Sequence, residues 1–355
     1  MEMQRDKSES LGYYNLARGL GITLIIFGHS VNPVLSRPDI IRPFQGAGTV
    51  LGGGIMAAFF MISGFGFYKR SPGKCFAIQK KLLLKPYAIV AAAVILTKLL
   101  LAFLKQRSFW NNGGELVFTY LFGLNAEGGG NIMGIPIESV SIFWFILALF
   151  GGWNLYNAIV QLKSVRLQRF LSAGCVVLGY FLTKLSKIWP FCLPMVLIAV
   201  GYLAVGEWIR KNHLLRKKIP LLFWIIMAAV VLLSAAFGQI NMVACIWHLG
   251  LVDVASTFGV GFLLLWVYAR VMEHEWKGRI VNILEEVGFH SIWAVCLHAY
   301  EKYIFPWHRV YEMLPNRPMI AVTLSFCGRC MVMYFLYRIL SYVEKKWKRK
   351  KRCVI

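Results

Sequence analysis

The chain has 355 residues, of which 58% are hydrophobic and only 15% are charged, whereas soluble domains average about 45–50% apolar and about 25% charged residues. Residues 43–68, 139–162, 188–206 and 219–252 contain no Asp, Glu, Lys or Arg, and a bilayer-spanning helix needs about 20 predominantly apolar residues. This composition excludes a soluble globular protein. The net charge of +23 comes from short basic clusters between apolar runs, which is typical of cytoplasmic loops and not of a nucleic-acid interface.

Apolar runs and their polar boundaries predict ten spanning helices in an all-α integral membrane fold. We expect one domain over residues 1–355. The spans are predicted near residues 11–31, 47–68, 82–104, 140–160, 170–185, 188–208, 219–237, 249–272, 287–305 and 319–342.

Lys and Arg gather in alternate connections, so the positive-inside rule predicts that both termini are cytoplasmic. Residues 344–355 form a basic tail that suits an anionic inner leaflet, so the expected partner is the lipid bilayer and not nucleic acid. The eight cysteines are scattered. Cys327 and Cys330 form a CxxC inside an apolar run without a second pair, which favours core packing. We predict no metal and no bound cofactor.

The first predicted span carries two ionisable residues, Arg18 and His29. Such groups are costly in a membrane and by default indicate function. Eleven residues at about 100° each return to within about 20° of the same helix face, about 16 Å further along the axis. We therefore expect Arg18 and His29 to face one cavity at different depths.

A neutral imidazole near the outer end of this span could take a proton from an attacking hydroxyl. The guanidinium of Arg18, deeper in the span, could hold an anionic or carbonyl group of a donor. The alternative is that Arg18 reaches the inner headgroups while His29 lies in the outer interface.

The longest polar stretch, residues 105–138, falls outside the membrane on this topology and is rich in glycine. It could cover a substrate site, or it could be a flexible solvated loop. The residues leave both alternatives open.

Several sequence segments follow one another along the chain: NLARGLGITLIIFGHS with Arg18 and His29, AAFFMISGFGF around Ser63, KKLLLKPY, SIFWFILALF around Trp144, and VGFHSIWAVCLH with Ser291 and His298. In this order they resemble the membrane-bound acyltransferase family 3. Arg18 and His29 are similar to the family's first-span pattern of Arg or Lys followed after ten residues by His. The resemblance runs from residue 15 to residue 298 or beyond.

The resemblance implies an inner-membrane enzyme that takes acyl groups from coenzyme A and acylates a surface glycan or a similar acceptor. Lys80, Lys81 and Lys85 stand where the family usually has arginines. Lysine binds phosphate as a point charge, without the bidentate fork of arginine. These lysines could bind the phosphates of coenzyme A, or they could be ordinary positive-inside charge.

Five further residues are candidates for substrate contact or support. Ser63 lacks the Gly-x-Ser-x-Gly elbow of a nucleophile, so close helix packing at Ser63–Gly64 is favoured. His298 is expected at a depth similar to that of His29, where a substrate or structural hydrogen bond is favoured over primary catalysis. Asp253 is the only carboxylate in the eighth span and could pair with a cation or a hydroxyl. The resemblance adds Trp144 and Ser291 to this set.

The predicted function is transfer of an acyl group, with acetyl expected, from cytoplasmic acyl-coenzyme A as co-substrate to a hydroxyl at the outer face of the cell membrane. His29 would be the base, and Arg18 would position the donor. The main alternative is a multi-spanning transporter of lipid, sugar or acyl groups that makes no bond. The sequence shows no internal repeat of the kind found in many transporters. A third possibility is an enzyme-like sensor or scaffold.

Overall fold

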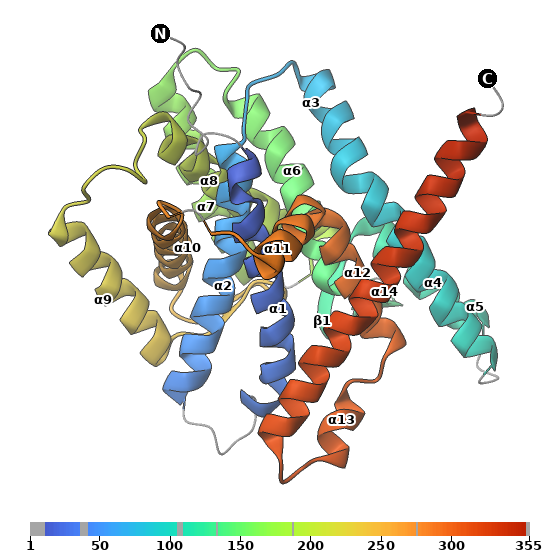
Figure 1. Ribbon diagram of the computed structural model, residues 1–355. Coiled ribbons are helices and arrows are strands. Elements are labelled where there is room, and N and C mark those ends of the chain that lie inside the picture. Colours follow the sequence, from blue (N-terminus) through green and yellow to red (C-terminus); the bar gives the residue numbers. More distant parts are fainter. Residues whose placement is uncertain are drawn as a thin grey trace.

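The computed structural model describes residues 11–35, 42–104, 109–132, 134–186, 188–274 and 276–352. It is predominantly helical (Figure 1). The long helices are α1 Asn15–Leu35, α2 Arg42–Phe65, α4 Lys85–Leu104, α6 Trp144–Ile159, α7 Val165–Leu185, α8 Leu193–Lys211, α9 Leu221–Phe237, α10 Leu251–Val271 and α14 Pro318–Arg352. The shorter ones are α3 Pro72–Gln79, α5 Phe109–Phe122, α11 Arg279–Phe289, α12 Ser291–Ile304 and α13 His308–Met313.

In the described part of the chain, four single turns and two hairpins complete the fold. The turns are η2 Leu11–Tyr14, η3 Lys80–Leu84, η4 Ser141–Phe143 and η5 Pro190–Cys192. Strand β1, Asn125–Ile132, pairs with β2, Ile135–Ser139, and β3, Ile240–Asn241, pairs with β4, Ile246–Trp247; both pairs are antiparallel.

Each of the ten predicted spans overlaps at least one helix, but the count of ten is not established. Within the described ranges, seven helical segments are long and apolar enough to cross a membrane, or eight if the bent pair α11 and α12 is one span. Helix α1 is not among the seven, and α9 has only 17 residues. Residues 1–10 lie outside the described part, so the expectation for the N-terminus remains a prediction.

Helix α2 lies at the centre of the bundle beside α1, and it also packs against α8, α9 and α10 (Figure 1). Small residues allow its backbone to touch that of α8. A Cβ on Gly64 would lie 2.2 Å from the Leu203 carbonyl oxygen, and one on Gly206 would lie 2.0 Å from that of Met61. Membrane helices commonly approach through such small residues, and this is the close packing that we predicted at Ser63–Gly64.

The third predicted span begins inside a π-helical segment. Helix α3, η3 and α4 form one continuous helical run from Pro72 to Leu104, and η3 has the wider π geometry. A π segment within an α-helix often lies at a functional site, because it rotates the side chains that follow. Here it holds Lys80 and Lys81 and ends directly before Lys85.

The expected outer loop is largely structured. Helix α5 packs against α4, and β2 packs against α5. Gly123 ends α5 with φ +58°, the left-handed conformation that glycine adopts without strain. The flexible-loop alternative is therefore wrong for the described residues 109–132 and 134–138, because α5 has apolar side chains that pack and the strands pair their backbone groups. Residues 105–108 and 133 lie outside the described part.

The ninth predicted span, residues 287–305, is not one straight helix. Helices α11 and α12 meet at His290 with a bend of 85°. A Cβ on Gly288 would lie 1.7 Å from the Asn15 carbonyl oxygen, and one on Gly19 would lie 1.9 Å from that of Leu284. Helix α11 thus crosses α1 in backbone contact, and the bend lets α12 start in a new direction.

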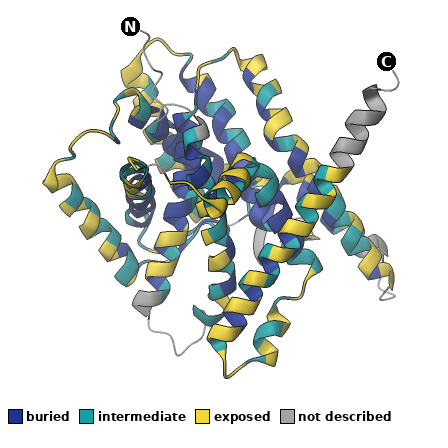
Figure 2. Cartoon of the chain, viewed as in Figure 1, coloured by how far each residue is buried: buried dark blue, intermediate teal, exposed yellow. Residues whose placement is uncertain are grey.

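Buried residues concentrate at the centre of the bundle, and exposed apolar residues lie on the peripheral helices (Figure 2). Phe170 on α7, Leu221 on α9 and Phe335 on α14 are 73%, 73% and 64% exposed. In water such surfaces would be unfavourable, whereas in a bilayer they face hydrocarbon. The chain is therefore a multi-pass membrane protein.

Candidate functional site

Two histidines from distant segments meet between α1 and α12. The ring centroids of His29 and His298 are 5.1 Å apart, and the ring planes are inclined by 48°. His298 is only 2% exposed. Both residues were singled out from the sequence, and the fold brings them together because α1 packs against α12.

His298 is followed one helical turn later by Glu301, whose side chain is fully buried. The Nδ1 atom of His298 lies 2.9 Å from Glu301 Oε1, although the ring is not aligned for a linear hydrogen bond. The Nε2 atom of His298 has no hydrogen-bond partner among the described residues. His298 therefore presents a carboxylate on one side of its ring and an unpaired nitrogen on the other.

Glu301 is held by two further donors. Arg329 of α14 donates from Nη1 to Glu301 Oε1 at 2.5 Å, and Trp307 donates from Nε1 to Oε2. The guanidinium of Arg329 also lies 4.9 Å from the centre of the Trp307 ring and is almost completely buried. This ion pair connects α12 to α14 beside the two histidines.

The next turn of α12 faces the hairpin and η4. Lys302 Nζ lies 3.4 Å from Ser141 Oγ, and the Tyr303 hydroxyl donates to the Ser139 carbonyl at 3.2 Å. Lys98 of α4 forms an ion pair with Glu138. A polar zone therefore continues from the histidines towards the connections predicted to be outside.

Arg18 lies far along α1 from His29, as the spacing requires. Its Nη1 atom lies 3.4 Å from Asn15 Oδ1, and the Tyr268 hydroxyl of α10 is an electrostatic neighbour. Within the described part, no hydrogen bond or ion pair joins Arg18 to His29 or to the lysines. The two residues can therefore contact different parts of a long ligand.

Lys80, Lys81 and Lys85 are all exposed. No hydrogen bond or ion pair is recorded for them within the described ranges. Exposed ammonium groups near the start of a spanning helix can contact phosphates in solution or at the membrane surface.

Asp253 is fully buried and its two oxygens have partners. The Ser234 hydroxyl donates to Oδ1 at 2.5 Å, and the Leu249 backbone N–H donates to Oδ2 at 2.9 Å. Asp253 thus pairs with a hydroxyl, one of the two expected options, and ties the start of α10 to α9. This arrangement is structural.

Ser63 and Ser291 have simpler surroundings. The Ser63 hydroxyl donates to the Phe59 carbonyl one turn earlier at 3.0 Å, which satisfies it within α2. Ser291 is the first residue of α12, directly after the bend. Among the described residues, no side-chain hydrogen bond or ion pair joins Ser291 to the two histidines.

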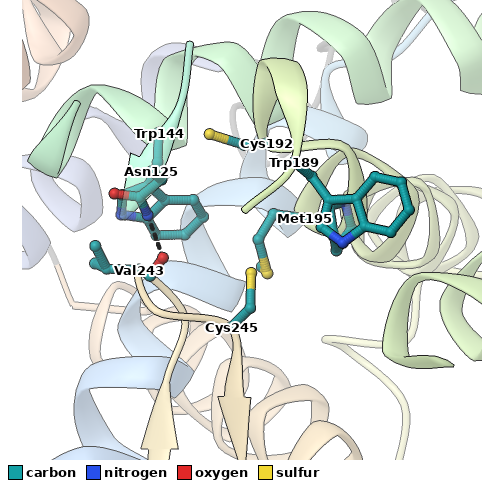
Figure 3. Close-up of a pocket in the computed structure, with 8 residues that line it drawn as sticks. Asn125, Trp144, Trp189, Cys192, Met195, Val243 and Cys245 are labelled. Atoms are coloured by element: carbon teal, nitrogen blue, oxygen red, sulfur yellow. Dashed lines mark hydrogen bonds between the residues drawn. The ribbon is translucent and has the colours of Figure 1, made fainter. Parts of the chain in front are cut away.

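Trp144 begins α6 and lines a small pocket (Figure 3). The other lining residues lie in β1, in the segment from Trp189 to Met195, and between β3 and β4. Asn125 of β1 donates to the Val243 carbonyl across one side of this pocket. The remaining lining residues are Trp189, Cys192, Pro194, Met195 and Cys245. Burial raises the pKa of the Cys245 thiol to about 12, so this thiol is neutral and unsuited to nucleophilic attack.

Glu301 and Arg329 were missed by the sequence analysis. Both are charged residues within predicted apolar spans. Because ionisable residues within membrane helices by default indicate function, this position alone would have indicated both residues. The spacing of three residues between His298 and Glu301 also places both on one helix face. Their link to Arg329 required the fold. Among the described residues, no group of three or more His, Cys, Asp or Glu side chains could hold a metal.

Comparison with known proteins supports the resemblance found in the sequence. A family model described as an acyltransferase domain, that of the acyltransferase 3 family, matches residues 11–338. No match was found among curated proteins or among solved structures. Because the family model covers nearly the whole chain, this protein belongs to the acyltransferase 3 family and is an acyltransferase that transfers groups other than aminoacyl groups.

Proposed function

We propose that the enzyme transfers an acyl group, with acetyl the expected one, from cytoplasmic acyl-coenzyme A to a hydroxyl at the outer face of the cell membrane. The acceptor class is a surface glycan or a similar polyhydroxyl compound. The observation that carries the proposal is the His29–His298 pair, 5.1 Å apart, in a family of acyltransferases.

In the proposed step, the acceptor hydroxyl oxygen attacks the thioester carbonyl carbon. The carbon–oxygen ester bond forms, the carbon–sulfur bond breaks, and the hydroxyl proton passes to the imidazole of His29. That proton then leaves with the coenzyme A thiolate as a thiol. A neutral imidazole suits this role because its unprotonated ring nitrogen can accept a proton.

The donor is proposed to enter from the cytoplasmic side. Lys80, Lys81 and Lys85 are exposed and would contact its phosphates, while Arg18 would hold a group further along the donor. The separation of Arg18 from His29, eleven residues or about 16 Å along α1, suits a long pantetheine arm whose thioester must reach an acceptor on the other side.

The test is release of the coenzyme A thiol by purified protein supplied with acetyl-coenzyme A and a glycan acceptor. We expect His29→Ala to lower the rate by about 10²- to 10⁴-fold, the usual contribution of a general base. Arg18→Lys should also lower it, because lysine lacks the planar fork. His308→Ala is the control, since His308 is exposed on α13.

All variants should have the melting temperature of the parent protein. Equal rates for His29→Ala and His308→Ala would refute the catalytic role of His29. Acyl movement across vesicle membranes without thiol release would instead favour the transporter alternative.

A further inference from the structure

The buried carboxylate of Glu301 is occupied on both oxygens by groups from two other parts of the chain. Arg329 donates to Oε1, which also lies 2.9 Å from Nδ1 of His298, and Trp307 donates to Oε2. Three positions therefore fix the orientation of one carboxylate. The fixed carboxylate of Glu301 lies beside His298, whose ring is in contact with His29.

Stability alone gives little reason for this arrangement. Removing two charges from water costs several kcal/mol per ion, and replacement of a buried ion pair by apolar residues is often neutral or stabilising. The pair lies within membrane helices, where charged side chains by default have a function. The negative charge of Glu301 and the positive charge of Arg329 compensate each other, so His298 can remain uncharged beside them.

A carboxylate beside Nδ1 favours the tautomer that carries its proton on that nitrogen, which leaves Nε2 as an acceptor. The Nε2 atom of His298 is buried and has no partner among the residues that the structure describes. It is thus available to a group in the site. The charged neighbours of His298 are Glu301, Lys302 and Arg329.

We infer that Glu301 is a positioning residue: fixed by Arg329 and Trp307, it holds His298 beside His29 with the proton on Nδ1, so that Nε2 accepts a hydrogen bond in the site. The inference rests on the proposed acyl transfer. When His29 has taken the hydroxyl proton, it carries a positive charge. The lone pair on Nε2 of a neutral His298 stabilises that charge, whereas an N–H group at Nε2 would destabilise it.

The kinetic test compares Glu301→Gln, Glu301→Asp, His298→Ala and the double variant Glu301→Gln/His298→Ala. Gln keeps the shape of the side chain but removes its charge. We expect kcat of Glu301→Gln to fall by about 10- to 100-fold, the loss found when carboxylates that orient metal-bound histidines are replaced, with an unchanged KM for acetyl-coenzyme A. Glu301→Asp keeps the charge and should lose less.

In the His298→Ala background, Glu301→Gln should cause no further loss, because the carboxylate acts through His298. The matched control is Glu207→Gln. Glu207 is also a nearly buried carboxylate with an ion-paired Arg and an aromatic donor, Tyr156, but it lies at the other end of the bundle. Its variant should lose stability without a change in kcat.

Histidine ¹⁵N NMR of the protein in liposomes provides a measurement that needs no substrate. The signal lost in His298→Ala identifies His298, and we expect the parent to show the Nδ1–H tautomer and Glu301→Gln to lose this preference. An Nε2–H tautomer in the parent, or full additivity in the double variant, would overturn the inference. If the parent shows the Nδ1–H tautomer but no acyl transfer, the proposed function fails and the positioning of His298 stands.

Discussion

Gly288 lies where α11 crosses α1, and one added methyl group there should displace part of the site. A Cβ on Gly288 would lie 1.7 Å from the Asn15 carbonyl oxygen, whereas ordinary contact begins at 3.4 Å. In Gly288→Ala the two backbones must therefore separate by the difference, about 1.7 Å. The clash cannot be relieved by the rotation of a side chain, because both contacting segments are helix backbone.

The displacement should affect stability and activity. Overpacking costs about 1–3 kcal/mol, which exceeds the gain of about 0.5–1 kcal/mol from replacing glycine by alanine within a helix. Helix α12 follows α11 directly, so the shift reaches His298 and changes its position relative to His29. A misplacement of about 1 Å can lower a catalysed rate by about 10²-fold.

The assay is thermal unfolding of the purified protein together with acyl transfer. Gly52→Ala is the control, because a Cβ on Gly52 of α2 meets nothing within 4 Å. We expect Gly52→Ala to match or exceed the parent in melting temperature and to keep the parent rate. A Gly288→Ala protein with the parent's melting temperature and rate would refute the close crossing of α1 and α11.

Three further predictions follow from the described geometry. Joint replacement of Lys80, Lys81 and Lys85 by Gln should raise KM for acyl-coenzyme A, because the loss of contacts that are equally strong in the ground state and the transition state raises KM. A change confined to kcat would contradict donor binding by these lysines. Asp253→Asn should cost about 1–3 kcal/mol of stability, as an imperfectly satisfied buried group does, while the folded fraction keeps the parent kcat. A cysteine at exposed Gly114 should react with an impermeant reagent from outside intact cells, and labelling only after lysis would reverse the predicted orientation.

The amino-acid sequence by itself determined where the helices lie and that the protein belongs in a membrane. Uncharged apolar runs of about spanning length predict helices, because backbone groups in hydrocarbon must bond within the segment. For this reason every predicted span overlaps a helix, whereas the shorter helices α3, α5 and α13 lie outside the predicted spans. His29 and Arg18 were also evident, because an ionisable residue contrasts with its apolar neighbours within a single run.

The partners of those residues depended on the packing of helices that are distant in the chain. Arg329 reaches Glu301 because α14 packs against α12, and residue spacing along either helix contains no information about that contact. The bend at His290 lies beside the close contact of Gly288 with α1, and no proline in its own segment indicates it. Local hydrophobicity therefore fixed the spanning helices, whereas the packing of helices that are distant in the chain decided which charged groups meet at the site.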